Sequence, residues 1–252
     1  MMNLLGTIVI FCVVALSLVF LTSIALVLFV VRCLGFKRSM DHLIYKLAQV
    51  WALIILSVSG CKLTVTGREH IPRTGGFCLV ANHNSIFDIV LLLATVGRPF
   101  GFIAKKELMV VPLINFWILL LRGLFIDRKN IRKAIGTINE GIRRIKAGAG
   151  MLIFPEGTRG KGKGMLPFKP GSLKLATKAG ALMVPLAITG SYDVFEKTYR
   201  FHPGPVSVNF APPMAAADIP VEDKRTIADQ VYAIIDDMLK KAEGSASVGA
   251  RL

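Results

Sequence analysis

Residues 82–88 read Asn-His-Asn-Ser-Ile-Phe-Asp, and they join two apolar segments of different character. Before them, Phe77–Ala81 is a short uninterrupted apolar run, which predicts a buried strand. From Ile86 to Val96 the pattern predicts a helix. The chain therefore turns from a strand into a helix at this point, as in folds that alternate strands with helices.

The same stretch places a histidine five positions before an aspartate. Neutral imidazole can accept a proton near pH 7, and a carboxylate can hold the ring in one tautomer. Within a single helix, side chains five positions apart point roughly 140° away from each other. We therefore expect His83 on the turn before the helix, and Asp88 in the first helical turn, folding back towards it.

After residue 61, short apolar runs alternate with helical patterns. An apolar stripe with spacings of four and three runs from Ile131 to Ile145, and a C-terminal helix is marked by Ile227 to Met238. This alternation predicts the α/β class, with a mixed, mostly parallel sheet flanked by helices. The expected strands are Lys62–Thr66, Phe77–Ala81, Phe100–Ala104, Leu124–Asp127, Met151–Phe154, Leu182–Ile188 and Val206–Phe210.

The N-terminal part has the composition of a membrane segment. Leu4–Val31 has no charged side chain and is long enough to span about 30 Å of hydrocarbon with some tilt. A cleaved signal peptide fits poorly, because no Lys or Arg precedes the run. Arg32 and Lys37 follow it, which favours a cytoplasmic location for everything after it. Val50–Val58 is too short to span, so we expect it in the interface or beside the first helix.

These observations divide the chain into three parts. We expect membrane-anchoring helices over residues 1–60, a catalytic domain over residues 61–243 and a disordered tail over residues 244–252. Whether the first helix spans the bilayer or lies in one leaflet stays open. The four cysteines form no C-x-x-C pair and are expected to be free thiols.

The net charge of +15 predicts anionic partners. Nucleic acid is disfavoured, because no nucleic-acid motif is present and a membrane segment is. Arg159–Lys178 contains six basic residues and no acidic one, which suits anionic membrane lipids, coenzyme A phosphates or an acidic acyl carrier protein. The sequence of Gly157–Gly164 is similar to the phosphate-binding P-loop motif, but Gly164 occupies the position at which that motif needs a magnesium-binding hydroxyl. A flexible basic loop is the better interpretation.

Further motifs follow residues 82–88 in a fixed order. Lys105–Leu108 reads K-K-E-L, Gly123–Arg128 reads G-L-F-I-D-R, Phe154–Arg159 reads F-P-E-G-T-R and Val184–Gly190 reads V-P-L-A-I-T-G. Together with the H-x4-D pair, this series resembles the glycerolipid acyltransferase family from about residue 62 to residue 210. N-H-N-S with F-P-E-G-T-R is most similar to the 1-acylglycerol-3-phosphate acyltransferases.

The resemblance implies an activity and a catalytic pair. His83 would act as general base and Asp88 as its partner, in a membrane-bound enzyme that acylates the sn-2 hydroxyl of lysophosphatidate to give phosphatidate. The donor would be a thioester of coenzyme A or acyl carrier protein, used as co-substrate, with no bound cofactor and no metal. No G-x-S-x-G is present, so no enzyme serine is expected to carry the acyl group. Another lyso-lipid acceptor, or an inactive lipid-binding protein, is the alternative.

The blocks also supply candidate substrate-binding residues. A guanidinium can hold a phosphate with two hydrogen bonds, and a lysine can hold it as a point charge. Glu156 could bind a substrate hydroxyl or anchor Arg159, and we expect a mixture of the two roles. The expected set is Lys105, Arg128, Glu156, Gly157, Thr158 and Arg159.

Met109–Leu121 is almost entirely apolar and too short to span a membrane. It predicts either a core helix or an apolar surface that rests on lipid or lines an acyl-chain tunnel. The sequence leaves this choice open.

Overall fold

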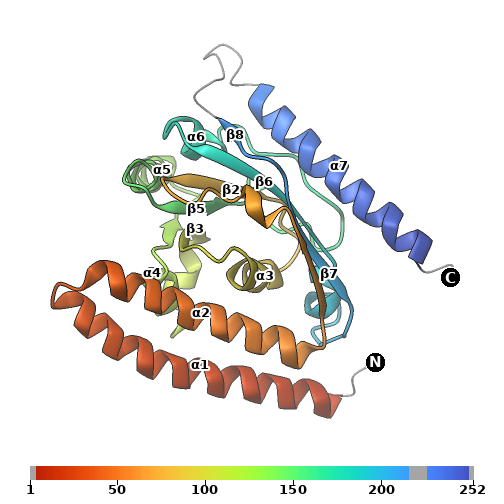
Figure 1. Cartoon of the computed structure of the whole chain (residues 1–252), viewed down its shortest axis with the longest axis horizontal. Coiled ribbons are helices and arrows are strands. Elements are labelled where there is room, and N and C mark those ends of the chain that lie inside the picture. Colours follow the sequence, from red (N-terminus) through yellow and green to blue (C-terminus); the bar gives the residue numbers. More distant parts are fainter. Residues whose placement is uncertain (1–3, 216–225, 250–252) are drawn as a thin grey trace.

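The computed structural model describes residues 4–215 and 226–249, which form one sheet between two layers of helices (Figure 1). The sheet has eight strands. From edge to edge, their order is β1 (Lys62–Thr66), β7 (Pro205–Phe210), β6 (Leu182–Thr189), β2 (Phe77–Ala81), β5 (Gly150–Ile153), β3 (Phe100–Lys105) and β4 (Leu124–Ile126), with β8 (Met214–Ala215) beside β6.

The strand directions confirm the predicted fold class. The strands β6, β2, β5, β3 and β4 run parallel to one another, and β1 runs parallel to β7. The pairs β6–β7 and β6–β8 are antiparallel, so the sheet is mixed but mostly parallel. All seven expected strands are present to within about one residue at each end. The short strand β8 was not predicted, because two residues are too few to show a period.

The central strand β2 is buried on both faces, as its continuous apolar sequence requires. Its side chains alternate between two cores. Phe77 and Leu79 face the layer that contains α2 (Lys37–Ser59), α3 (Phe87–Thr95) and α4 (Ile114–Leu120). Cys78 and Val80 face the layer of α5 (Ile131–Lys146), α6 (Lys174–Thr177) and α7 (Thr226–Gly249).

The C-terminal helix is longer than expected. We predicted a tail from Gly244 onwards, but α7 continues to Gly249. No proline lies between Thr226 and Gly249 to end it earlier. The last three residues of the predicted tail lie outside the described residues.

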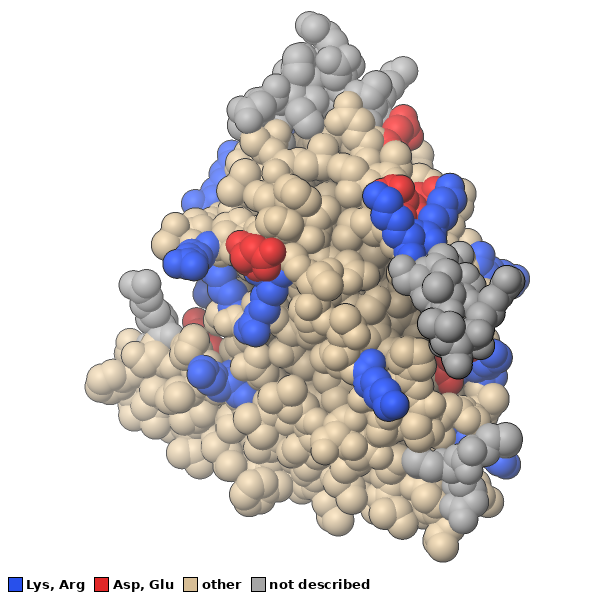
Figure 2. Space-filling model, turned by 45° about the vertical axis from the view of Figure 1, so that its right-hand side comes forward, with Lys and Arg blue, Asp and Glu red and all other residues tan. Residues whose placement is uncertain are grey.

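The N-terminal segment forms two long helices that pack side by side, α1 (Leu4–Cys33) and α2 (Figure 1). Trp51 Nε1 of α2 donates to the carbonyl of Val14 on α1 over 3.3 Å. The Val50–Val58 stretch forms the second half of α2. It lies beside the first helix, which was one of the two positions that we predicted for it. Both helices are long and apolar enough to cross a membrane, by length and composition. Figure 2 shows the uncharged lower face over α1.

The Met109–Leu121 stretch is partly core and partly exposed. It contains the end of a 3₁₀ turn, η2 (Lys106–Val110), followed by α4. Trp117 is buried, and its Nε1 donates to Thr22 Oγ1 of α1 over 2.8 Å. Val110 and Leu119 are exposed, so this stretch adds an apolar surface beside that of α1.

Asn82 connects the end of β2 to β6. Its side chain is fully buried; Nδ2 donates to the Ile188 carbonyl over 2.9 Å, and Oδ1 accepts from the Ile188 amide over 2.7 Å. The strand-to-helix turn thus begins from a residue fixed to the neighbouring strand.

We predict that Asn82→Ala lowers the free energy of unfolding by about 2 kcal/mol or more, because it leaves two buried backbone groups without partners. Chemical unfolding in detergent measures this. Asn130→Ala is the matched control, since Asn130 is an exposed helix cap that accepts from Lys133, and its loss should cost about 1 kcal/mol. Equal losses in the two variants would contradict the role of Asn82.

Candidate active site

The predicted site residues gather at one edge of the sheet. The parallel strands β2, β5, β3 and β4 are consecutive, so their carboxyl ends meet there. His83 follows β2, Arg159 comes after β5, Lys105 ends β3 and Arg128 follows β4. Neighbouring strands lie about 4.8 Å apart, so this row extends over roughly 15 Å from β2 to β4.

The His83–Asp88 pair has the geometry that the spacing predicted. His83 Nδ1 lies 2.7 Å from Asp88 Oδ2, with His83 on the turn after β2 and Asp88 in the first turn of α3. The same Oδ2 accepts from the backbone amides of Asn84 at 2.8 Å and Ser85 at 3.0 Å. Asp88 is 0% exposed. A carboxylate that accepts three hydrogen bonds holds the imidazole proton on Nδ1 and leaves Nε2 as a proton acceptor.

The third block, Phe154–Arg159, fixes the histidine from its other sides. The ring of His83 stacks on Phe154, with ring centroids 3.9 Å apart and planes at 15°. The His83 amide donates to Glu156 Oε1 over 2.6 Å, and the His83 carbonyl accepts from the Gly160 amide over 2.7 Å. The backbone and the ring of His83 are therefore both held by the segment that follows β5.

The structure corrects the expected role of Glu156. Its second oxygen, Oε2, accepts from the Leu166 amide over 2.8 Å, so backbone amides occupy both carboxylate oxygens. The side chain is only 2% exposed. Burial is the largest influence and raises the pKa of Glu156 from 4.5 to about 7, although the amides of Leu166 and His83 oppose it. Glu156 thus supports the turn that carries His83, and the carboxylate that anchors Arg159 is a different one.

The anchor of Arg159 is Glu196, a residue that sequence reasoning missed. Arg159 Nη1 lies 2.7 Å from Glu196 Oε1, and Glu196 Oε2 accepts from the Ile86 amide over 2.9 Å. Glu196 is buried at the end of a π-helical turn, η3 (Tyr192–Glu196), which follows β6. The sequence feature that could have pointed to Glu196 is an acidic residue directly after an aromatic one, Phe195, in the segment that follows the Val184–Gly190 motif.

Arg128 is tied to the third block as well. It is exposed, and its Nη1 donates to the carbonyl of Gly157. Gly157 has φ of +68°, and a Cβ there would lie 2.9 Å from the Lys169 side chain, so only glycine fits without strain. Thr158 is exposed beside it. The Gly123–Arg128 and Phe154–Arg159 motifs therefore meet at this turn.

Lys105 and Lys106 have different surroundings at the end of β3. Lys106 Nζ lies 2.7 Å from Asp127 Oδ2 and links the ends of β3 and β4. Lys105 is more exposed and lies 3.5 Å from Glu107, a looser ion pair. Of the two, Lys105 has the ammonium that is freer to meet an anion. Among residues 4–215 and 226–249, no cluster of three or more His, Cys, Asp or Glu side chains has the arrangement that a metal ion needs.

Comparisons with known proteins identify similar sequences. The sequence model of the family described as Acyltransferase matches residues 62–189. The chain is 32% identical to a 1-acyl-sn-glycerol-3-phosphate acyltransferase of Borreliella burgdorferi over 60% of each chain. It is 32% identical to one of Limnanthes douglasii over 76% of this chain and 67% of that one. Their human relative, the alpha form, is 30% identical over 74% of this chain and 66% of its own.

A solved structure is similar over nearly the full length. The crystal structure of the 1-acyl-sn-glycerophosphate (LPA) acyltransferase PlsC from Thermotoga maritima superposes with a TM-score of 0.84. The two chains are 28% identical, and the match covers 96% of each. Against the curated relatives the match is shorter, since it reaches only 60% of the length of the Borreliella burgdorferi protein.

The raised pKa of Glu156 generates a prediction about stability. Folded protein keeps the Glu156 proton up to about pH 7, whereas the unfolded chain loses it near pH 4.5. The folded state therefore binds more protons in this window, so the Glu156 contribution to the free energy of unfolding falls as pH rises from about 4.5 to 7.

Glu156→Gln cannot titrate, so we expect the stability difference between parent and variant to shrink from pH 5 to pH 7.5. Thermal unfolding midpoints in detergent across this range measure it. The control is Glu140→Gln, because Arg144 and Arg143 lower the pKa of Glu140 and move its titration below this window. A Glu156→Gln difference that stays constant with pH would contradict the assigned protonation.

Proposed function

Because the chain belongs to the acyltransferase family, we propose that it is a membrane-bound 1-acyl-sn-glycerol-3-phosphate acyltransferase. It moves an acyl chain from a thioester to the sn-2 hydroxyl of lysophosphatidate and produces phosphatidate. The observation that carries the proposal is the 2.7 Å contact between His83 Nδ1 and the buried Asp88 carboxylate. The names of the similar proteins support the choice of acceptor.

The proposed chemistry uses the free nitrogen of His83. His83 Nε2 takes the proton of the sn-2 hydroxyl while that oxygen attacks the thioester carbonyl carbon. The carbon–sulfur bond then breaks, and the imidazolium returns the proton to the departing thiolate. Asp88 stays ionised throughout and stabilises the imidazolium, as the aspartate does in a serine-protease triad. Stacking on Phe154 keeps the ring in the attacking orientation.

The phosphate of the acceptor is assigned to the cations along the same edge. Arg159 follows β5, the strand next to β2, so it is the nearest of the three block cations to His83 in the strand order. Glu196 holds one end of the guanidinium and leaves its other donors for a phosphate oxygen. Lys105 and Arg128 lie further along the row and assist as point charges or second contacts.

The membrane location and the donor complete the proposal. The uncharged face of α1 and the exposed apolar side chains Val110 and Leu119 suit contact with lipid, from which the acceptor comes. The catalytic domain lies on the cytoplasmic side, because Arg32 and Lys37 follow α1. The acyl donor is a coenzyme A or acyl carrier protein thioester, and the basic segment from Arg159 to Lys178 suits the anionic groups of either.

A matrix assay tests the function. Purified full-length protein is offered lysophosphatidate, lysophosphatidylcholine and lyso-ornithine lipid, each with acyl-coenzyme A and with acyl carrier protein thioester. We expect lysophosphatidate to be the preferred acceptor. Preference for another lyso-lipid would overturn the acceptor, and no transfer with any pair would favour an inactive lipid-binding protein.

In the same assay, His83→Ala should lower turnover by ~10²–10⁴-fold, because the general base is lost. The matched control is His202→Ala, since His202 Nε2 contacts the exposed Thr198 hydroxyl and not a carboxylate. Near-normal turnover of His83→Ala would refute the assignment of the base.

Asp88→Asn should also lower turnover strongly, because an amide neither balances the imidazolium nor enforces the tautomer. The double variant with His83→Ala should be hardly worse than His83→Ala alone, since the two residues act as a unit. Measured kcat values for the two single variants and the double variant decide this. Full additivity would place the role of Asp88 outside the pair.

A further inference from the structure

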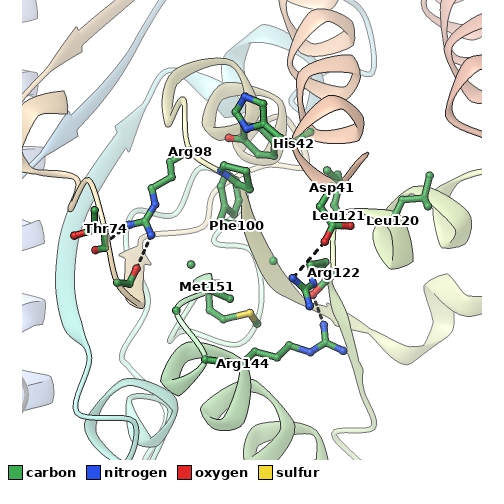
Figure 3. Close-up of a pocket in the computed structure, with 18 of the residues that line it drawn as sticks. Asp41, His42, Thr74, Arg98, Phe100, Leu120, Leu121, Arg122, Arg144 and Met151 are labelled. Carbon is green, nitrogen blue, oxygen red and sulfur yellow. Dashed lines mark hydrogen bonds and ion pairs between the residues drawn. The ribbon is translucent and has the colours of Figure 1, made fainter. Parts of the chain in front are cut away.

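A cavity lies at the opposite end of the sheet from His83. Its volume is about 1060 Å³, and it is lined by the amino ends of β3 and β5, the first turns of α2 and the ends of α4 and α5 (Figure 3). Since β2 runs from Phe77 to Ala81 at about 3.3 Å per residue, the strand alone separates the two ends of the sheet by roughly 15 Å. None of the residues assigned to acyl transfer lines this cavity.

The lining of this cavity is strongly basic. It contains five arginines and two carboxylates, Asp41 and Glu140. Both carboxylates are shared: Asp41 lies 2.6 Å from Arg32 and 3.5 Å from Arg122, and Glu140 pairs with both Arg143 and Arg144. The five arginines are Arg73, Arg98, Arg122, Arg143 and Arg144. An excess of three positive charges around one concave space is an electrostatic site for an anion.

The arginines are held in place to different degrees. Arg98 donates to the Thr74 carbonyl, a contact seen in Figure 3. It also donates to the Pro72 carbonyl and lies over the Phe77 ring, so it is a fixed charge without a carboxylate partner. Arg144 donates to the carbonyl of Arg122 over 2.6 Å. Arg73 is exposed and has no partner among the described residues. The cavity is therefore lined both by arginines that hydrogen bonds hold in place and by an arginine that is free to move.

Tyr45 carries a buried hydroxyl whose hydrogen-bonding capacity the described residues leave unused. This residue lines the cavity and is only 3% exposed, and its hydroxyl has no hydrogen-bond partner in the described part of the chain. A buried hydroxyl without a partner costs free energy, and it would donate to a phosphate oxygen once a local rearrangement opens it to the cavity. The ring itself is held edge-on against Phe100, with centroids 5.9 Å apart.

The cavity adjoins the apolar end of the helical pair. The turn between α1 and α2 exposes Leu34 and Phe36, and the cavity lining begins three residues later at Ser39. Exposed apolar side chains next to arginines are the arrangement that meets the headgroup level of a bilayer. An anion reaching this cavity from the membrane needs to travel only a short distance.

We propose that this cavity is a second binding site, which takes the phosphate-bearing headgroup of an anionic membrane phospholipid. The arginines hold the phosphate, the Tyr45 hydroxyl donates to one of its oxygens, and the acyl chains run out past the α1–α2 turn. The site is separate from the acyl-transfer edge and does not depend on the proposed reaction.

The test is equilibrium binding of short-chain phosphatidylglycerol to the purified full chain in neutral detergent, with no acyl donor present. The double variant Arg73→Glu/Arg143→Glu should bind at least tenfold more weakly, since it reverses two lining charges. The matched control is Arg200→Glu/Lys240→Glu, which makes the same change in net charge elsewhere. Arg143 and Lys240 are 78% and 73% exposed, and each pairs with a carboxylate on its own helix.

Tyr45→Phe is the uncharged probe of the same site. It keeps the ring and removes only the hydroxyl, so it should weaken lipid binding about tenfold if that group donates to a phosphate. Its thermal midpoint without lipid should not fall, because the hydroxyl has no partner to lose. Acyl transfer to a soluble short-chain acceptor should stay within about twofold of the parent in all of these variants.

Two further measurements distinguish a lipid phosphate from free inorganic phosphate as the bound anion. Inorganic phosphate at millimolar concentration should not displace the lipid, because the acyl chains add apolar contact. Equal lipid affinity in the cavity and control variants would overturn the proposal. Binding of inorganic phosphate without lipid would also overturn it. A cavity variant that loses only transfer from a protein-borne thioester would overturn it too, because that result would assign this face to an acidic protein.

Discussion

One carboxylate oxygen, Oδ2 of Asp88, organises the strand-to-helix turn on which the site depends. It accepts from the His83 ring and from the amides of Asn84 and Ser85, while Asp88 Oδ1 has no partner among the described residues. The two amides belong to the same turn that presents the ring. The interaction that orients the base therefore also shapes the backbone that carries it, and a change at Asp88 disturbs both.

Two further buried carboxylates extend this pattern. Glu156 holds the amide of His83 from the segment after β5, and Glu196 holds the amide of Ile86 from the segment after β6. The segments that follow β5 and β6, the two neighbours of β2, are thus both bound to the short turn after β2. Each of these carboxyl groups accepts backbone hydrogen bonds, which replace part of the lost water, although burial outweighs the amides at Glu156. Arg159 gains its place through the same network, since Glu196 is its partner.

Much of this could be predicted from the sequence. The strand, the turn and the Asp88 contact followed from an apolar run, a fixed spacing and helix geometry, all of which are local. The partner of Arg159 could not be predicted, because Glu196 lies 37 positions away (196 − 159) and meets it only through the sheet order. Glu156 was misjudged for the same reason: its two amide donors, at His83 and Leu166, become neighbours only in the fold.

The central claim is that Asp88 fixes the proton of His83 on Nδ1, so that Nε2 is free to act as a base. ¹⁵N NMR of histidine-labelled protein in nanodiscs, near neutral pH, reports directly which ring nitrogen carries the proton. A His83→Gln reference sample lacks the His83 signals and so identifies them among those of the four histidines. The account predicts that the His83 signals show a protonated Nδ1 and an unprotonated Nε2, and that this preference weakens in Asp88→Asn. A proton found on Nε2, or a tautomer unaffected by Asp88→Asn, would contradict it.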